Sequence, residues 1–84
     1  MLLQGRTAVV TGAARGIGAA TAAALARFGA DVAVCDREDM GATVKTVEEA
    51  GRRVYAATVD VREGDAVRTF LTASYAEFGA FDVP

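Results

Sequence analysis

The stretch Thr11-Gly12-Ala13-Ala14-Arg15-Gly16-Ile17-Gly18 separates two segments of different periodicity. Residues 6–11 form a short apolar run rich in β-branched side chains, which predicts a buried strand. Residues 16–28 carry apolar side chains at three- and four-residue spacing, which predicts a helix. Glycines allow a sharp turn and close approach to a ligand, and the start of a helix favours a phosphate. The stretch therefore predicts an anion-binding turn, with a tight strand-to-helix turn that binds nothing as the alternative.

The same alternation continues along the chain. Strand patterns recur at residues 31–36 and 54–59, helix patterns at 40–50 and 66–78, and residues 81–83 look like the start of a fourth strand. Because consecutive parallel strands need helical crossovers, this order predicts an α/β fold with a parallel sheet. A doubly wound sheet usually has about six strands. We therefore expect residues 1–84 to form a single, partial domain, truncated after its first half.

Composition and charge exclude several classes of protein. The 84 residues are 52% hydrophobic and 24% charged, as in a folded globular chain. A net charge of −2 with no cluster of Lys or Arg argues against nucleic-acid binding. Cys35 is the only cysteine and histidine is absent, so we expect no disulfide and no metal site. Without a signal-peptide pattern or an apolar run of about 18 residues, we expect a cytoplasmic protein that does not enter a membrane.

An acidic residue ends the second predicted strand. Asp36 follows Gly18 by 18 residues, close to the roughly 20 expected between a glycine-rich turn and the carboxylate that binds an adenosine ribose. The alternative is that Asp36 begins or caps the second helix. Its position after a strand, together with the glycine turn, favours binding of a dinucleotide.

The turn is not the general G-x-G-x-x-G fingerprint, because Thr21 stands where the third glycine or alanine would be. It resembles instead the T-G-x-x-x-G-x-G turn of the short-chain dehydrogenase/reductase family. Asp60-Val61 resembles that family's D-V/L pair, and Phe78-Gly79 with residues 81–83 resembles its F-G-x-L-D-x-L stretch. The resemblance covers essentially the whole chain and is closest to the 3-oxoacyl carrier-protein reductase-like members.

This resemblance implies a Rossmann-like fold, of which the chain would hold the first half (β-α-β-α-β-α and the start of a fourth strand). It also implies an NAD(P)-dependent oxidoreductase that transfers hydride between a nicotinamide and a small alcohol or carbonyl substrate. By this resemblance, the pyrophosphate loop would be shaped by Gly12, Gly16, Ile17 and Gly18. Asp36 would bind the ribose, and Asp60 with Val61 would hold the adenine.

The choice between NAD and NADP depends on the charges near the ribose. A carboxylate at Asp36 would accept hydrogen bonds from ribose hydroxyls and would repel a 2′-phosphate, so we predict NAD. Arg15 in the turn and Arg37 after Asp36 are the two basic side chains that could pair with such a phosphate. NADP therefore stays open as an alternative, as does an exposed surface position for each arginine.

No catalytic residue is predicted in this chain. The family's chemistry requires a serine and a Y-x-x-x-K pair, whose tyrosine and lysine share one face of a helix. Here Val59 follows Tyr55 by four residues, Gly79 follows Tyr75, and Lys45 is the only lysine. We expect the 84 residues by themselves to be inactive.

Two alternative hypotheses place the chain in other functional classes. The chain could be a non-catalytic nucleotide-binding or dimerising module, because an exposed edge of the half-sheet would favour a homo-oligomer. It could also be half of a nucleoside-binding methyltransferase, although the Asp60-Val61 match would then be a coincidence.

Overall fold

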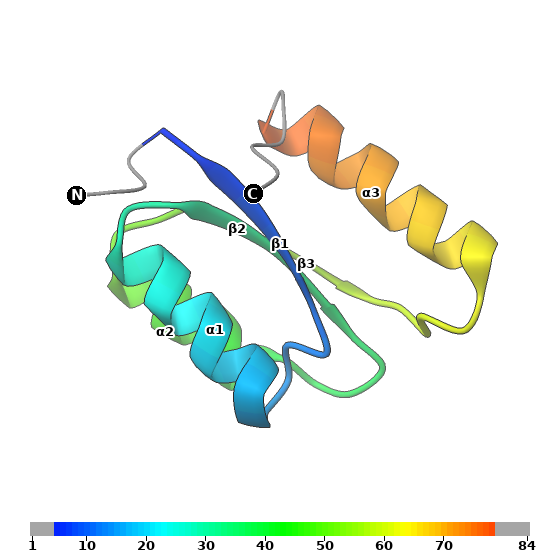
Figure 1. The fold of residues 1–84 in the computed structure, drawn as a ribbon, viewed down its shortest axis with the longest axis horizontal. Coiled ribbons are helices and arrows are strands. Elements are labelled where there is room, and N and C mark those ends of the chain that lie inside the picture. The colour runs from blue at the N-terminus through cyan, green and yellow to red at the C-terminus, as the bar shows by residue number, and fades with distance from the viewer. Residues whose placement is uncertain (1–4, 79–84) are drawn as a thin grey trace.

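The computed structural model describes residues 5–78, which form three strands and three helices in strict alternation (Figure 1). The elements are β1 (Thr7–Thr11), α1 (Gly16–Arg27), β2 (Asp31–Asp36), α2 (Gly41–Glu49), β3 (Val54–Thr58) and α3 (Gly64–Phe78). The α/β class and the order of elements predicted from the sequence are confirmed, with most boundaries within one or two residues of those predicted. The fourth strand predicted at residues 81–83 lies outside the described residues.

The three strands form one parallel sheet in the order β1-β2-β3. Thr11 pairs with Cys35 and Asp36 pairs with Thr58, so the carboxyl ends of all three strands meet at one edge of the sheet. Ligands of open parallel sheets bind outside this edge. A ligand of this fold would therefore contact the three loops that leave this edge, at residues 12–15, 37–40 and 59–63.

Helices cover both faces of the sheet, with α1 and α2 on one side and α3 on the other (Figure 1). Alternate residues of β2 supply the two cores, because successive side chains of a strand point to opposite faces. Val32 and Val34 pack with α1 and α2, whereas Ala33 and Cys35 pack with α3. All four are buried, so β2 is the central strand of a three-layer arrangement.

A buried carboxylate organises the opposite edge of the sheet. Asp31, the first residue of β2, accepts hydrogen bonds from the guanidinium of Arg52 and from the amide and guanidinium of Arg53. The Arg53 guanidinium also lies 5.1 Å from the centre of the Phe78 ring at the end of α3. Burial raises the pKa of Asp31, but the hydrogen bonds and charge of Arg53, with the charge of Arg52, outweigh this and hold it below its usual value.

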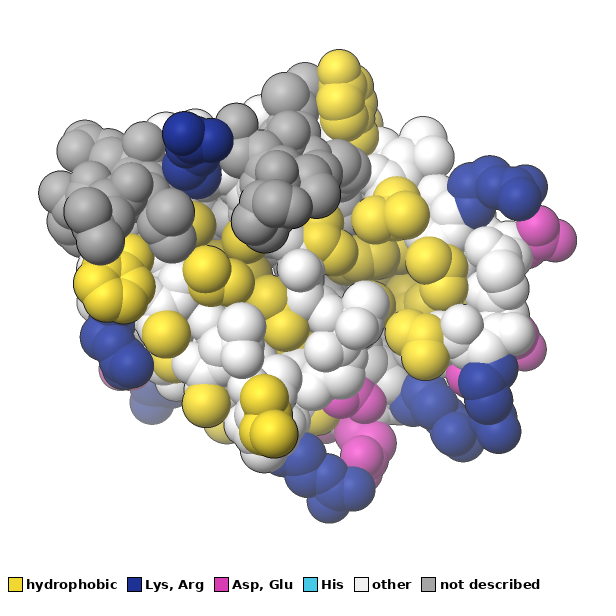
Figure 2. All heavy atoms as spheres, viewed as in Figure 1, with side chains coloured by type: hydrophobic (Ala, Val, Ile, Leu, Met, Phe, Trp, Pro, Cys, Tyr) yellow, Lys and Arg dark blue, Asp and Glu magenta, His cyan; other side chains and the backbone are white. Residues whose placement is uncertain are grey.

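Hydrophobic side chains also reach the surface, as a band over β1 between α1 and α3, with charged side chains at its margins (Figure 2). Val9 of β1 and Leu71 and Tyr75 of α3 are among the large apolar side chains that are exposed. None of the helices within residues 5–78 combines the length and apolar character required to cross a membrane.

Candidate functional site

The glycine turn after β1 has a backbone that only glycine adopts readily. Gly12 and Gly16 both have φ of +64°, in the left-handed region that strains residues with a Cβ. Helix α1 begins at Gly16 with no acidic residue in its first turn. The first amides of a helix have no partner within it and carry its positive dipole end. The turn therefore presents amides that favour an anion.

Gly18 has a different role, which concerns packing within the chain. A Cβ at this position would overlap the carbonyl oxygen of Gly12 and would also press on the backbone of Ala13. Only glycine allows the first turn of α1 to lie this close to the loop that precedes it. Beside it, Ile17 is 87% exposed, an unusual position for a large apolar side chain.

Contacts from β2 and α2 hold the turn in place. The amide of Ala13 donates to the carbonyl of Cys35 over 3.2 Å, and the buried hydroxyl of Thr43 donates to the carbonyl of Ala13 over 2.6 Å. The amide of Ala14 donates to Oδ2 of Asp36 over 2.9 Å. Thr43 was not singled out from the sequence, because nothing in the local pattern distinguishes it from Thr46, the other threonine of the same helix.

Asp36 is positioned at the end of β2 by backbone amides. Its Oδ2 accepts from Ala14 and its Oδ1 accepts from the amide of Glu38 over 3.0 Å. These hydrogen bonds, from Glu38 and then Ala14, lower the pKa of Asp36, so the carboxylate is charged at neutral pH. Helix α2 begins at Gly41 after an N-cap at Met40, so the alternative in which Asp36 caps that helix is wrong. Asp36 instead joins the turn after β1 to the loop after β2.

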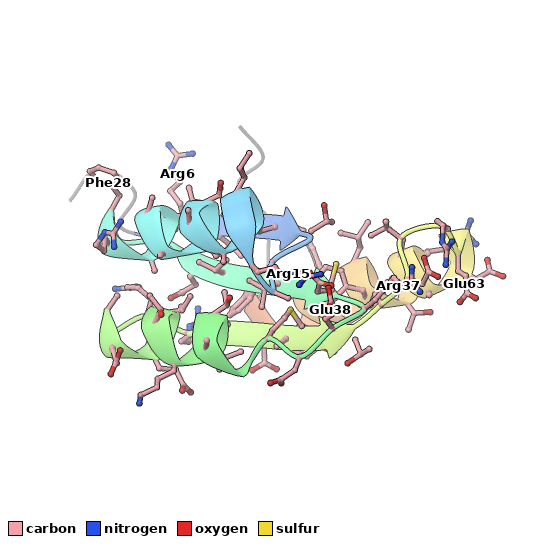
Figure 3. All side chains as sticks on the ribbon, turned by 90° about the horizontal axis from the view of Figure 1, so that it is seen from below. Arg6, Arg15, Phe28, Arg37, Glu38 and Glu63 are labelled. Carbon is pink, nitrogen blue, oxygen red and sulfur yellow. The ribbon has the colours of Figure 1, made fainter. Side chains whose placement is uncertain are left out.

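Four charged residues line an open recess of about 440 Å³ at this edge: Arg15, Asp36, Arg37 and Glu38. The structure thus brings Arg15 and Arg37 to the same recess as Asp36. Figure 3 shows Arg15 and Glu38 lying against each other, and the two side chains form an ion pair with a nitrogen-to-oxygen distance of 2.8 Å. Arg37 extends instead toward the loop after β3, where Glu63 lies (Figure 3). The sequence pattern did not single out Glu38 either, since Asp39 beside it is an equally plausible acidic residue of the same loop.

Asp60 and Val61 follow β3 and are linked to the recess through Arg37. The carboxylate of Asp60 accepts three hydrogen bonds from the guanidinium of Arg62 and one from its backbone amide, at 2.8–3.2 Å. Nε of Arg37 lies 3.9 Å from the same carboxylate. The Arg62 hydrogen bonds, with its charge and that of Arg37, hold the pKa of Asp60 far below its usual range. Val61, the next residue, is 53% exposed and presents an apolar side chain to solvent.

Comparison with known proteins places the chain among proteins of similar sequence and structure. A family model described as short chain dehydrogenase matches residues 6–83. An uncharacterised NAD-dependent oxidoreductase of Mycobacterium tuberculosis is 38% identical, over 96% of this chain and 35% of the relative. The cis-4-hydroxycyclohexanecarboxylate dehydrogenase of Sinomonas cyclohexanicum is 44% identical, over 93% of this chain and 32% of that enzyme.

Solved structures agree with these matches. A short chain dehydrogenase from Mycobacterium paratuberculosis, crystallised with bound NAD, superposes with a TM-score of 0.94 at 36% identity. The superposition covers 98% of this chain and 36% of that one. The chain spans about a third of the length of the curated relatives it matches.

Proposed function

Because the chain belongs to the short chain dehydrogenase family, we propose that it is the cofactor-binding part of an NAD-dependent oxidoreductase. The observation that carries this proposal is the hydrogen bond from Ala14 to Asp36, which holds an ionised carboxylate beside an anion-favouring glycine turn. Support comes also from the relatives, since the M. tuberculosis protein is described as NAD-dependent and the M. paratuberculosis protein was crystallised with NAD. In this proposal residues 1–84 form a single dinucleotide-binding unit.

The pyrophosphate would lie at the start of α1. Gly12 and Gly16 give the turn its left-handed backbone, and Gly18 lets the helix approach it closely. The free amides at the start of the helix would donate hydrogen bonds to phosphate oxygens. The exposed side chain of Ile17 would cover apolar parts of the cofactor, and Arg15 lies at the edge of the same turn.

The adenosine half would occupy the edge formed by the loops after β2 and β3. Each oxygen of Asp36 accepts one amide hydrogen bond, and a carboxylate oxygen can accept a further one. Asp36 would therefore accept hydrogen bonds from ribose hydroxyls. Because Arg62 already engages the carboxylate of Asp60, we assign the adenine contact to the apolar surface of Val61 and to the backbone around Asp60. Arg37 would border the ribose from the side of Asp60.

A bound nicotinamide cofactor supplies the chemistry of hydride transfer. The residues of this chain hold and orient it, which lowers the entropic cost of bringing the reactants together. The complete protein would act on a small alcohol or carbonyl compound. The sequence contains no Y-x-x-x-K pair, so these 84 residues would bind the cofactor and would not turn over a substrate.

We also propose that the chain self-associates. Large apolar side chains of β1 and α3 are exposed to solvent: Val9, Leu71 and Tyr75. Exposed apolar side chains that gather on one face favour contact with another chain. Sedimentation equilibrium should show a species heavier than the 8.7 kDa monomer, and a monomer at all concentrations would contradict this part of the proposal.

Calorimetric titration of NAD into the chain and into Asp36→Asn tests the function. The variant should bind NAD about tenfold more weakly, because asparagine offers one neutral acceptor oxygen where Asp36 offers two charged ones. Asp65→Asn is the matched control, since its side chain is fully open to solvent on α3. The proposal is overturned if the wild-type chain binds no NAD, or if Asp36→Asn and Asp65→Asn bind it equally well.

A further inference from the structure

Four consecutive links close a ring at the mouth of the recess. Ala14 donates its amide to Asp36, Asp36 accepts the amide of Glu38, and the Glu38 side chain pairs with Arg15. The peptide bond between Ala14 and Arg15 completes the ring. The backbone at Glu38 is therefore fixed by the same carboxylate that would bind the ribose, and its side chain reaches back across the recess to Arg15.

The ion pairs around the recess limit the positive charge that is available to a ligand there. The charge of Arg15 is matched by Glu38 at 2.8 Å, and that of Arg37 is shared with Asp60 at 3.9 Å. A phosphate on the ribose 2′-hydroxyl would add roughly 1.5 to 2 negative charges. It would meet the carboxylates of Asp36 and Glu38 in the same recess, and it would have to displace Glu38 before it could pair with Arg15.

We propose that Glu38 determines cofactor specificity by holding Arg15 in an ion pair that a 2′-phosphate would need to break. This inference rests on the proposed function, and it adds a second carboxylate to the one expected at Asp36. The pair is open to solvent, with 78% of the Arg15 side chain and 56% of the Glu38 side chain exposed. Removal of Glu38 should therefore leave the fold intact and free Arg15 for another anion.

Calorimetric titration of NAD and NADP into the wild-type chain and into Glu38→Ala tests this role. In Glu38→Ala the affinity for NADP should rise about fivefold, the scale of one solvent-exposed ion pair, while the affinity for NAD changes less than about twofold. The backbone amide of residue 38 is retained, so the hydrogen bond to Asp36 is kept. Glu48→Ala is the matched control, because it removes the same charge from the exposed face of α2 and should leave both affinities unchanged.

The double variant Arg15→Gln/Glu38→Ala separates pairing from simple repulsion. If Glu38 acts by holding Arg15, the gain in NADP affinity disappears in the double variant. A gain that persists there, or an unchanged ratio of NADP to NAD affinity in Glu38→Ala, overturns the inference while leaving NAD binding, and with it the proposed function, in place. Failure of the wild-type chain to bind NAD overturns both.

Discussion

The backbone amide of Ala14 lies 2.9 Å from Oδ2 of Asp36, although 22 residues separate the two in sequence. This hydrogen bond joins the turn after β1 to the end of β2. It makes the conformation of the glycine turn depend on the residue that would bind the ribose. The two halves of the proposed cofactor site are therefore one structural unit, and changes to the contacts that hold the turn should affect both stability and NAD binding.

Replacement of Gly18 by alanine should damage this unit. The added Cβ would overlap the carbonyl oxygen of Gly12, and overpacking of this kind costs about 1–3 kcal/mol. We expect Gly18→Ala to lower the free energy of unfolding by that amount and to weaken NAD binding. Urea denaturation and calorimetric titration would measure the two effects.

Gly64→Ala provides the control for that substitution. A Cβ at Gly64 would have no neighbour within 4 Å, and this glycine lies in helix α3. The free energy of unfolding of Gly64→Ala should equal that of the wild type or exceed it by about 0.5–1 kcal/mol, because alanine loses less backbone entropy than glycine on folding. Equal stability of the two variants would show that the approach of α1 to the turn is not as close as described.

Thr43→Val tests the contact that α2 makes with the turn. The buried Thr43 hydroxyl is replaced by a methyl group of similar size, which leaves the carbonyl of Ala13 without this donor and costs about 1–3 kcal/mol. Thr46→Val is the matched control, since its exposed hydroxyl donates only to Ala42 in the same helix. Thermal unfolding of both variants should show a large drop in Tm for Thr43→Val alone; similar drops for both would contradict this role of Thr43.

Asp31 should make the stability of the fold sensitive to acid. Its pKa is lower in the folded chain than its ordinary value of 3.8, so the unfolded chain takes up a proton more readily. The contribution of the ionised carboxylate is fully present above that ordinary value and is lost as the pH falls through the lower, folded-state pKa. Asp36 and Asp60 have pKa shifts of the same sign and add to the same loss.

The variant Asp31→Asn isolates the part due to Asp31. It should lower the free energy of unfolding by about 2 kcal/mol at pH 7, because Arg52 and Arg53 lose a charged acceptor. The free energy of unfolding of Asp31→Asn should then fall less steeply than that of the wild type between about pH 5 and pH 2. Paired carboxylates titrate over about this range. Urea titrations at several pH values would measure this, with Asp65→Asn as control, and parallel curves for wild type and Asp31→Asn would refute it.

Cys35 should be unreactive while the chain is folded. Its side chain is 1% exposed in the core between β2 and α3, and burial, together with the charge of Asp36, raises the pKa of the thiol. A thiol reagent such as dithionitrobenzoate should react slowly with the native chain and rapidly in urea. Cys35 is the only cysteine, so the readout has one source, and fast reaction of the native chain would contradict its burial.

The order of the elements and the place of the glycine turn could be predicted from the sequence. These follow from short-range physics: periodicity of two or of about 3.6 residues, and glycines where φ must be positive. Asp36 could be found in the same way, because it ends a strand at a recognisable distance from Gly18. Even there the sequence left two roles open, and only the start of α2 at Gly41 excluded the helix cap.

The side chains that hold the site together could not be predicted from the sequence, because their partners are brought close only by the packing of distant segments. Thr43 contacts Ala13 across 30 residues, and Arg53 contacts Asp31 across 22. The pairing of Glu38 with Arg15 likewise crosses from one loop to another. Any threonine of α2 or any acidic residue of the loop satisfies the same local pattern, since periodicity specifies a face and not a partner. The partner is chosen by the packing of α1 and α2 against one face of the sheet, which brings the ends of distant segments within hydrogen-bonding distance.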